Sequence, residues 1–221
     1  PVFSVARSSL KGPEDQLVGI SLVYSAETFL RQSGSTIVNL DCLVIGFGKV
    51  GRGVADCLLG RRARVQIYDT NPIQLIQATT HGYITNENLT SALKTADIIF
   101  CATGSKALKT ADFDLMKDET VIVSATSRDD EFGDLIGLDQ SFDLCPMENW
   151  SEYISHLSRK RIIMVRGGEA ANFAHNAVVG PYIYLVNAEI IAAACELING
   201  NYESGINEIS EDVRRGLAQL W

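Results

Sequence analysis

The chain has 221 residues, 46% of them hydrophobic and 21% charged, which is enough for one sizeable core but short for two full domains. Its net charge of −8 without a long basic run disfavours nucleic acid and acidic membranes as partners. Its five cysteines have no metal-ligand spacing and mostly lie in apolar runs. We therefore expect buried thiols, a cytoplasmic protein and no metal site. We also expect no membrane span, because no apolar stretch reaches the required ~20 residues.

Residues 1–36 are expected to form an N-terminal segment and a long helix. Apolar side chains recur at helical spacing from Glu14 to Arg31, acidic residues stand in the first turn, and Gly34 follows as a stop signal. At the other end, residues 179–221 are predicted to form an apolar helix over Pro181–Ile198 and an amphipathic helix over Ile206–Leu220. We expect these C-terminal helices to pack on the N-terminal helix.

Residues 37–178 alternate between short apolar strands and helices. This order predicts an α/β fold, a doubly wound parallel sheet of the Rossmann type covered by helices on both faces. The expected strands are Cys42–Ile45, Arg64–Tyr68, Ile98–Cys101, Thr120–Ser124 and Arg161–Val165. Three helices are expected between them: one that ends at Leu59, one that begins at Pro72 and is terminated by Gly82, and one over Leu89–Lys94.

A glycine motif, Gly46-Phe47-Gly48-Lys49-Val50-Gly51, directly follows the first of these strands. In such a motif the first glycine permits a tight turn, the second lets the backbone approach a pyrophosphate, and the third lets the helix pack close to the strand. The pyrophosphate then lies at the helix N-terminus, where free N–H groups and the helix dipole favour an anion. The strand-to-helix context favours a dinucleotide site over a merely structural glycine turn.

An acidic residue, Asp69, stands eighteen positions after Gly51, at the end of the second strand. A carboxylate there accepts hydrogen bonds from ribose hydroxyls and repels a 2′-phosphate, which favours NAD over NADP. Two further segments follow later strands, where ligands lie in open α/β sheets. Ordinary strand-to-helix loops are the alternative for them. These further predicted cofactor contacts are Ala102, Thr103, Gly104, Ser105, Ala125, Thr126 and Ser127.

From about Lys11 to Ile198 the chain resembles the NAD-binding half of S-adenosylhomocysteine hydrolase. The likeness lies in Gly46–Gly53, Asp69–Pro72, Gln77–Tyr83, Thr103-Gly104, Met116–Asp118, and Lys160–Ile163 followed by Gly168 and Asn172. The resemblance implies that NAD is the cofactor. It also implies that Thr70, Asn71 and Gln74 belong to the segment that grips the adenine ribose, and that Asn172 lies close to the nicotinamide.

The chain also departs from this family. Family enzymes have a separate substrate domain before the NAD domain, and their Gly-His pair is replaced here by Thr126-Ser127 and their Gly-His-Pro hinge by Val179-Gly180-Pro181. The C-terminal lysine and tyrosine that reach a neighbouring subunit in the family have no counterpart. We therefore expect complete hydrolase activity to require another chain or a further region.

Three residues are candidates for catalysis. Lys11 and Asp15 align with a lysine and an aspartate that the family uses at the substrate. Lys11 would serve as a general base if desolvation lowered its pKa, with Asp15 orienting it. The alternative is a surface lysine beside a first-turn acid. His175 follows the last strand near the expected nicotinamide end and is a candidate for substrate or proton handling.

Three functions are consistent with these features. In the family, NAD oxidises the 3′-hydroxyl of the substrate ribose, so the first is a redox-assisted hydrolase acting on a nucleoside-type substrate. The second is a non-catalytic NAD-binding module for sensing or assembly. The third is an NAD-dependent dehydrogenase of a small hydroxylated substrate, although the Arg, Glu and His set of such enzymes is not located. The expected partner is a second copy of the chain or another chain that carries a substrate domain.

Overall fold

The structure, a computed structural model, describes residues 1–132, 141–175, 179–200 and 202–221, without the side chains of Arg128, Asp129 and His175. The chain forms two compact units, Val18–Val178 and Pro1–Leu17 with Val179–Trp221. The division falls inside helix α1 (Gly12–Gln32), whereas we expected it at residue 36. The larger part of the long helix, from Val18 on, therefore belongs to the unit that contains the sheet.

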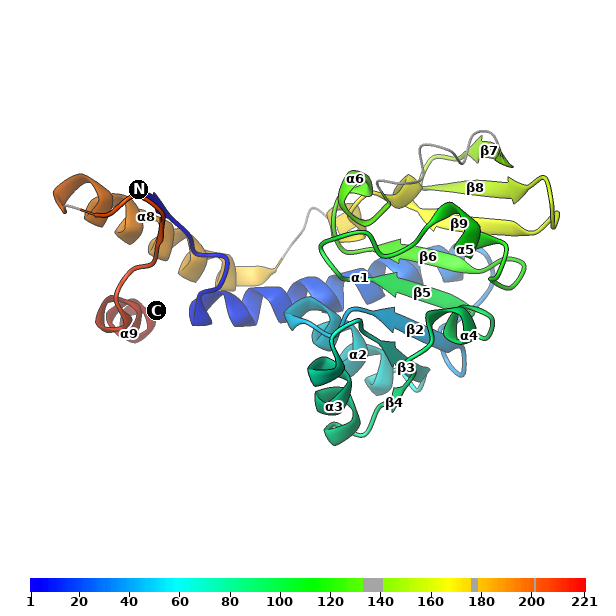
Figure 1. Ribbon diagram of the computed structural model, residues 1–221, viewed down its shortest axis with the longest axis horizontal. Coiled ribbons are helices and arrows are strands. Elements are labelled where there is room, and N and C mark those ends of the chain that lie inside the picture. Colours follow the sequence, from blue (N-terminus) through cyan, green and yellow to red (C-terminus); the bar gives the residue numbers. More distant parts are fainter. Residues whose placement is uncertain (133–140, 176–178, 201) are drawn as a thin grey trace. The chain divides into compact units, whose positions relative to one another are not determined.

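The larger unit is built on an eight-stranded sheet with the order β4-β3-β2-β5-β6-β9-β8-β7 (Figure 1). The six strands from β4 to β9 in this order are parallel and have the arrangement of the doubly wound dinucleotide-binding fold. The predicted fold class is confirmed. The strands are β2 (Asp41–Ile45), β3 (Arg64–Tyr68), β4 (Ile84–Thr85), β5 (Ile98–Cys101), β6 (Val121–Ser124), β7 (Phe142–Pro146), β8 (Trp150–Ser155) and β9 (Arg161–Val165).

The sequence did not predict strands β4, β7 and β8. Strand β4 has only two residues. Strand β8 pairs antiparallel with both β7 and β9, so one edge of the sheet is a hairpin and the sheet is mixed rather than wholly parallel. Side chains of β7 are mostly exposed, with only Phe142 buried. An edge strand of this kind lacks the continuous apolar run by which a buried parallel strand is recognised.

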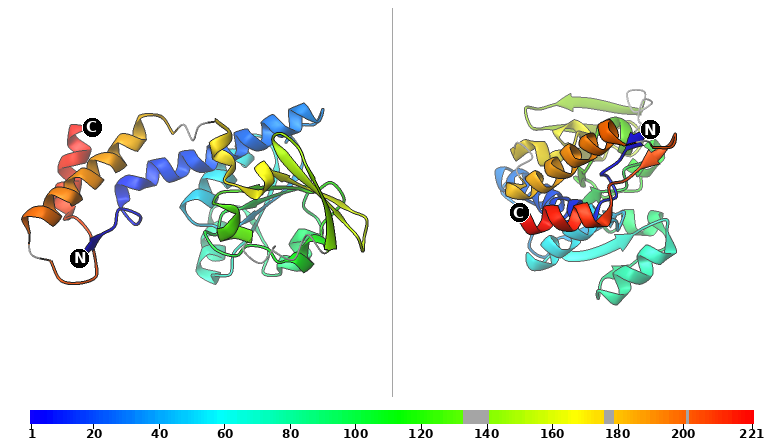
Figure 2. Two further views of the ribbon diagram at one scale, coloured as in Figure 1. Left: turned by 90° about the horizontal axis from the view of Figure 1, so that it is seen from above. Right: turned by 90° about the vertical axis from the view of Figure 1, so that its left-hand side faces the viewer.

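Helices cover both faces of the sheet (Figure 2). Two hydrophobic cores lie on either side of the sheet. Along β2, Cys42 and Val44 enter the core beneath α1 and α2, while Leu43 and Ile45 enter the opposite core. This alternation is the two-residue period of a β-strand. The remaining helices of this unit are α2 (Lys49–Gly60), α3 (Pro72–Thr80), α4 (Leu89–Leu93), α5 (Thr110–Phe113), α6 (Arg128–Phe132) and the 3-10 helices η3 (Arg166–Gly168) and η4 (Ala171–His175).

Helix α1 packs against α2 at a glycine. A Cβ atom added to Gly19 would lie 2.5 Å from the carbonyl oxygen of Val50 and 2.6 Å from the backbone nitrogen of Val54. Two helices approach this closely only where a side chain is absent. Gly19 therefore sets the separation of α1 from the helix that carries the glycine motif.

The smaller unit joins the two ends of the chain. Strand β1 (Val2–Phe3) pairs in parallel with β10 (Ile206–Asn207). The final helix, α9, covers Glu211–Leu220 instead of starting at Ile206, because Ser210 caps it by accepting a hydrogen bond from the N–H of Val213. The other elements of this unit are η1 (Ser9–Lys11), η5 (Gly180–Tyr182) and α8 (Ile183–Asn199).

One stretch, Gly180–Asn199, is long and apolar enough to cross a membrane, and 22% of it is buried. This corrects the expectation that no stretch has the length of a span. Length and composition alone are weak evidence for a membrane helix. Within this stretch the buried Glu189 forms an ion pair with Arg214 of α9, with 2.8 Å between Oε1 and Nε. A charged pair of this kind favours packing of α8 on protein.

All five cysteines are free thiols. Cys42 and Cys101 are buried as expected, and burial raises the pKa of the Cys42 thiol to about 12, which makes it unreactive. The expectation was wrong for Cys145 and Cys195, which are exposed. In the described part of the chain, no three His, Cys, Asp or Glu side chains are grouped so as to hold a metal ion.

The contact at Gly19 predicts that Gly19→Ala destabilises the larger unit. The added methyl group would meet the α2 backbone, and overpacking of this kind costs about 1–3 kcal/mol. Gly60→Ala is the matched control, because a Cβ atom at Gly60 meets nothing within 4 Å. Urea unfolding monitored by circular dichroism measures both variants, and equal stabilities of the two would contradict the close packing.

Candidate cofactor site

A cavity of about 530 Å³ opens at the carboxyl ends of β2, β3 and β5. The strand order reverses between β2 and β5, and ligands of doubly wound sheets bind at such a reversal. The cavity brings together three segments that are far apart in the sequence. The predicted cofactor residues that line it are Gly46, Gly48, Asp69, Thr70, Asn71, Gln74, Ala102, Thr103 and Ser105.

The three glycines of the motif differ in their surroundings. Gly46 has a φ of +94°, and a Cβ atom there would lie 2.6 Å from the carbonyl oxygen of Ala102. At Gly51 the added atom would lie only 1.9 Å from the carbonyl oxygen of Gly46. Gly48 has a φ of −74°, and a Cβ atom there would meet nothing within 4 Å. Gly46 and Gly51 thus serve the turn and the packing, whereas Gly48 leaves open space at the cavity.

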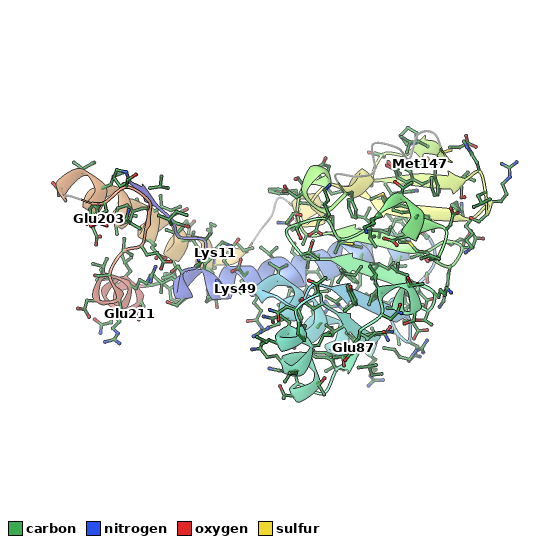
Figure 3. The ribbon with its side chains drawn as sticks, in the orientation of Figure 1. Lys11, Lys49, Glu87, Met147, Glu203 and Glu211 are labelled. Atoms are coloured by element: carbon green, nitrogen blue, oxygen red, sulfur yellow. The ribbon has the colours of Figure 1, made fainter. Side chains whose placement is uncertain are left out.

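Helix α2 presents its N-terminus beside this open space. Gly48 is its N-cap and supplies no side-chain hydrogen bond to the first turn. The N–H groups of that turn are the natural partners of a phosphate. Lys49 is the first residue of the helix (Figure 3). The glycine cradle and the helix end therefore fit the pyrophosphate of NAD.

Asp69 links the glycine loop to the loop after β3. Its Oδ2 accepts a hydrogen bond from the N–H of Phe47 at 2.7 Å, and its Oδ1 accepts one from the N–H of Asn71 at 2.7 Å. A carboxylate offers about four acceptor directions, so two remain for ribose hydroxyls. Asn71 in turn caps α3 by accepting a hydrogen bond from the N–H of Ile73. The carboxylate is thereby held at the ribose end of the cavity.

Sequence reasoning missed Arg52, which supports this end of the site. Its guanidinium donates to the carbonyl of Phe47 at 3.3 Å and to Oε1 of Gln74 at 3.0 Å, and it also contacts Gln77. It lies over the Phe47 ring, 5.3 Å from the centroid. Arg52 orients Gln74, which lines the cavity. Its position one residue after Gly51 was the available signal, but Gln74 and Gln77 lie 22 and 25 residues further along the chain, on α3.

Sequence reasoning also missed Glu131, a fully buried acid of α6 that accepts hydrogen bonds from Thr103 and Gly104. Nothing in the sequence distinguishes it from the neighbouring Asp129 and Asp130. Gly104 does not itself line the cavity. Its backbone N–H is occupied by this carboxylate.

The other predicted cofactor residues lie outside the cavity lining: Phe47, Lys49, Val50, Gly51, Ala125, Thr126, Ser127 and Asn172. Of these, Asn172 shows a feature of a ligand contact. It is 7% exposed, and its buried Oδ1 has no hydrogen-bond partner in the described part of the chain. Buried polar atoms normally have partners. An unpaired amide oxygen fits the carboxamide of a nicotinamide.

Lys11 and Asp15 belong to the smaller unit. The ammonium group of Lys11 donates hydrogen bonds to the carboxylates of Glu14 and Asp15. Burial lowers the pKa of Lys11, but the hydrogen bonds to Asp15 and Glu14 and the charges of the two carboxylates together outweigh burial, so the pKa is raised. The condition set for a general base, a lowered pKa, is therefore not met in this arrangement. The backbone of His175 lies at the end of η4, and its side chain lies outside the described residues.

The contrast between two glycines yields a prediction. Gly48→Ala should leave stability unchanged, because the methyl group enters open space, but should weaken NAD binding by roughly tenfold or more, because the cofactor backbone needs that space. Gly51→Ala should instead destabilise the protein by about 1–3 kcal/mol or more. Calorimetric titration with NAD and thermal unfolding separate the two effects. A Gly48→Ala protein that binds NAD like the wild type would contradict this assignment.

Asp69→Ala should weaken NAD binding by roughly tenfold or more, because the ribose loses a charged acceptor. The same change should reduce the preference for NAD over NADP, because the charge that repels the 2′-phosphate is gone. Titrations with both dinucleotides measure the ratio. Asp143→Ala, at an exposed carboxylate of β7, is the control, and an unchanged ratio in the Asp69 variant would refute the prediction.

Two solved structures of dipicolinate synthase chains resemble this protein. The one from Bacillus subtilis is 17% identical with a TM-score of 0.55, over 83% of this chain and 57% of that chain. The one from Bacillus halodurans is 16% identical with a TM-score of 0.46, over 52% of this chain and 41% of that chain. The first likeness supports the α/β fold alone. This chain thus spans about 41% to 57% of the length of these structures.

The family comparison covers more than half of the chain. Residues 24–178 match the family described as S-adenosyl-L-homocysteine hydrolase, NAD binding domain. The matched range contains the glycine motif, Asp69, the loop after β5 and Asn172, which confirms both the resemblance and NAD as the cofactor. The chain belongs to the S-adenosyl-L-homocysteine hydrolase NAD-binding domain family.

Proposed function

We propose that this chain supplies the NAD-binding part of an enzyme that oxidises a hydroxyl group of a nucleoside-type substrate in a redox-assisted hydrolysis. The observation that carries the proposal is the cavity at the reversal of the strand order, lined by the segments that the family shares. A cavity open at this edge of the sheet leaves a bound dinucleotide accessible to a second reactant.

Bound NAD would supply the hydride acceptor. The protein's own task is to hold both ends of the dinucleotide. In this proposal Asp69 holds the adenine ribose, the α2 N-terminus holds the pyrophosphate, and Asn172 donates and accepts hydrogen bonds at the nicotinamide carboxamide. The residues Thr126-Ser127, which replace the family's Gly-His pair, provide no imidazole for proton transfer.

A base is required to take the proton of the substrate hydroxyl. Lys11 and His175 remain the candidates. As a cation paired with Glu14 and Asp15, Lys11 would first have to lose a proton that its neighbours stabilise. Substrate binding that separates Lys11 from one carboxylate would lower its pKa toward the range of a base. We propose that Lys11 acts only in such a substrate-bound arrangement, with Asp15 as its orienting partner.

A non-catalytic NAD-binding module for sensing or assembly is the second candidate function. The raised pKa of Lys11 favours it, since a lysine held as a cation does not accept a proton. The replacement of the family's Gly-His pair by Thr126-Ser127 favours it as well. In this case NAD would bind and remain oxidised when a nucleoside is added.

The substrate region is proposed to lie in another polypeptide region or chain that contacts α8. Ile190, Ile191 and Ile198 on this helix are 49%, 64% and 81% exposed, which is unusual for large apolar side chains gathered on one helix. We propose that a second copy or a chain carrying a substrate domain covers them. The five free thiols support a reducing, cytoplasmic compartment for this assembly.

Native mass spectrometry of the purified protein tests these proposals together, because one spectrum reports the oligomer mass and any retained NAD. We expect retained NAD and, for the second-copy arrangement, a dimer at micromolar concentration. Addition of adenosine should then produce the absorbance of NADH if the oxidation site is complete, and Lys11→Ala should abolish this signal while NAD stays bound. Retained NAD without reduction would favour the non-catalytic module, and absence of NAD binding would refute both candidates.

A further inference from the structure

A single buried acid, Glu131, contacts the loop that follows β5 at several points. Its Oε1 accepts hydrogen bonds from the N–H groups of Thr103 and Gly104, each at 2.9 Å. Its Oε2 lies 2.7 Å from the hydroxyl oxygen of Thr103. The backbone carbonyl of Glu131 accepts a hydrogen bond from the N–H of Ala107 at 2.9 Å. One residue of α6 thus holds both the start and the end of this loop.

The geometry of the loop requires an acceptor at this position. Gly104 has a φ of +63°, and the N–H groups of Thr103 and Gly104 converge on one carboxylate oxygen. Consecutive N–H groups in such a turn form a concave site that binds anions. Here the protein supplies the acceptor from its own chain.

The burial of Glu131 indicates that its contact with the loop after β5 has a structural role. The residue is 0% exposed, and buried charges destabilise a protein unless they are paired or hydrogen-bonded. The hydrogen bonds from Thr103 and Gly104 provide such pairing. Burial raises the pKa of the Glu131 carboxyl, while the hydrogen bonds from Thr103 and Gly104 oppose that rise. Apart from Thr126 after β6, the partners of this carboxylate belong to the loop after β5.

The loop is a wall of the cofactor cavity. Ala102, Thr103 and Ser105 line it. The carbonyl of Ala102 also lies against Gly46, so tightly that a Cβ atom there would come within 2.6 Å. A shift of the loop would therefore move both the cavity wall and the glycine turn that receives the pyrophosphate.

From these contacts we infer that Glu131 is a positioning residue, which holds the loop after β5 in the conformation that binds NAD. It acts through Thr103 and Gly104. The inference rests on the NAD-binding part of the proposed function and does not depend on whether a substrate is oxidised.

Two substitutions of Glu131 distinguish the effect of its side-chain length from the effect of its charge. In Glu131→Gln, Oε1 still accepts from both backbone N–H groups. Its Nε2 donates to the Thr103 hydroxyl, whose proton is then directed to the carbonyl of Ser105, 2.7 Å away. Glu131→Asp keeps the charge but is one methylene shorter and does not reach both N–H groups. If the loop needs a side chain that reaches both N–H groups, Glu131→Gln should bind NAD more tightly than Glu131→Asp. If the site needs a negative charge, Glu131→Asp should bind NAD more tightly.

The experiment titrates the full chain with NAD by calorimetry for the wild type, Glu131→Gln, Glu131→Asp and Glu87→Ala, an exposed control glutamate (Figure 3). We expect Glu131→Asp to weaken binding roughly tenfold, and the other two to bind within about threefold of the wild type. Hydrogen exchange of segment 102–107 in the NAD-free proteins should be faster in Glu131→Asp alone.

Wild-type affinity in Glu131→Asp, or equal weakening in Glu131→Gln, would overturn the inference. If Glu131→Asp is unfolded by circular dichroism, Glu131→Gln decides the matter by itself: wild-type affinity together with slow exchange of segment 102–107 supports loop positioning, and their loss overturns it. A wild-type protein that does not bind NAD would refute the NAD-binding part of the proposed function, and this inference with it. If the wild-type protein binds NAD and Glu131→Asp binds it equally well, this inference is refuted and the NAD-binding part of the proposed function is not.

Discussion

Backbone contact at glycines is the constraint on which the rest of this structure depends. Gly51 lies so close to the carbonyl of Gly46 that a Cβ atom would be 1.9 Å from it, and on the other side Gly19 brings α1 against the α2 backbone. Helix α2 is thereby held between the turn and α1 without intervening side chains. Its N-terminus is consequently aimed at the carboxyl ends of β2, β3 and β5, where the cavity lies. The position at which a charged ligand binds is therefore set by the close backbone packing at Gly19 and Gly51.

Two carboxylates, those of Asp69 and Glu131, hold the loops around the cavity. Asp69 accepts N–H groups from the glycine loop and from the loop after β3, and Glu131 accepts N–H groups from the loop after β5. Each carboxylate satisfies backbone donors that have no partner in a helix or strand. The loops around the cavity are therefore held before a ligand arrives, which reduces the entropy lost on binding. The remaining acceptor directions of Asp69 are the part of this network that faces a ribose.

The relation of this chain to its family is uneven along the sequence. The cofactor segments are those of the family, whereas Thr126-Ser127 replaces the family's Gly-His pair and Lys11 is held as a cation by Glu14 and Asp15. Binding of NAD needs only shape, N–H donors and an acceptor for the ribose. Oxidation of a hydroxyl also needs a base and a positioned substrate. The two requirements are separable, which is why membership in the family determines the cofactor but leaves the reaction a proposal.

The sequence by itself determined the glycine motif, Asp69 and the buried parallel strands, because each is encoded by neighbouring residues: apolar runs, turn glycines and an acid at a strand end. The tertiary structure decided the rest. It joined Thr103 to Glu131, 28 residues apart, and added the β7–β8 hairpin at the sheet edge. These features depend on which side chains meet after folding. A local pattern predicts an element and its exposed donors, whereas the partner that satisfies them is set by the packing of distant segments.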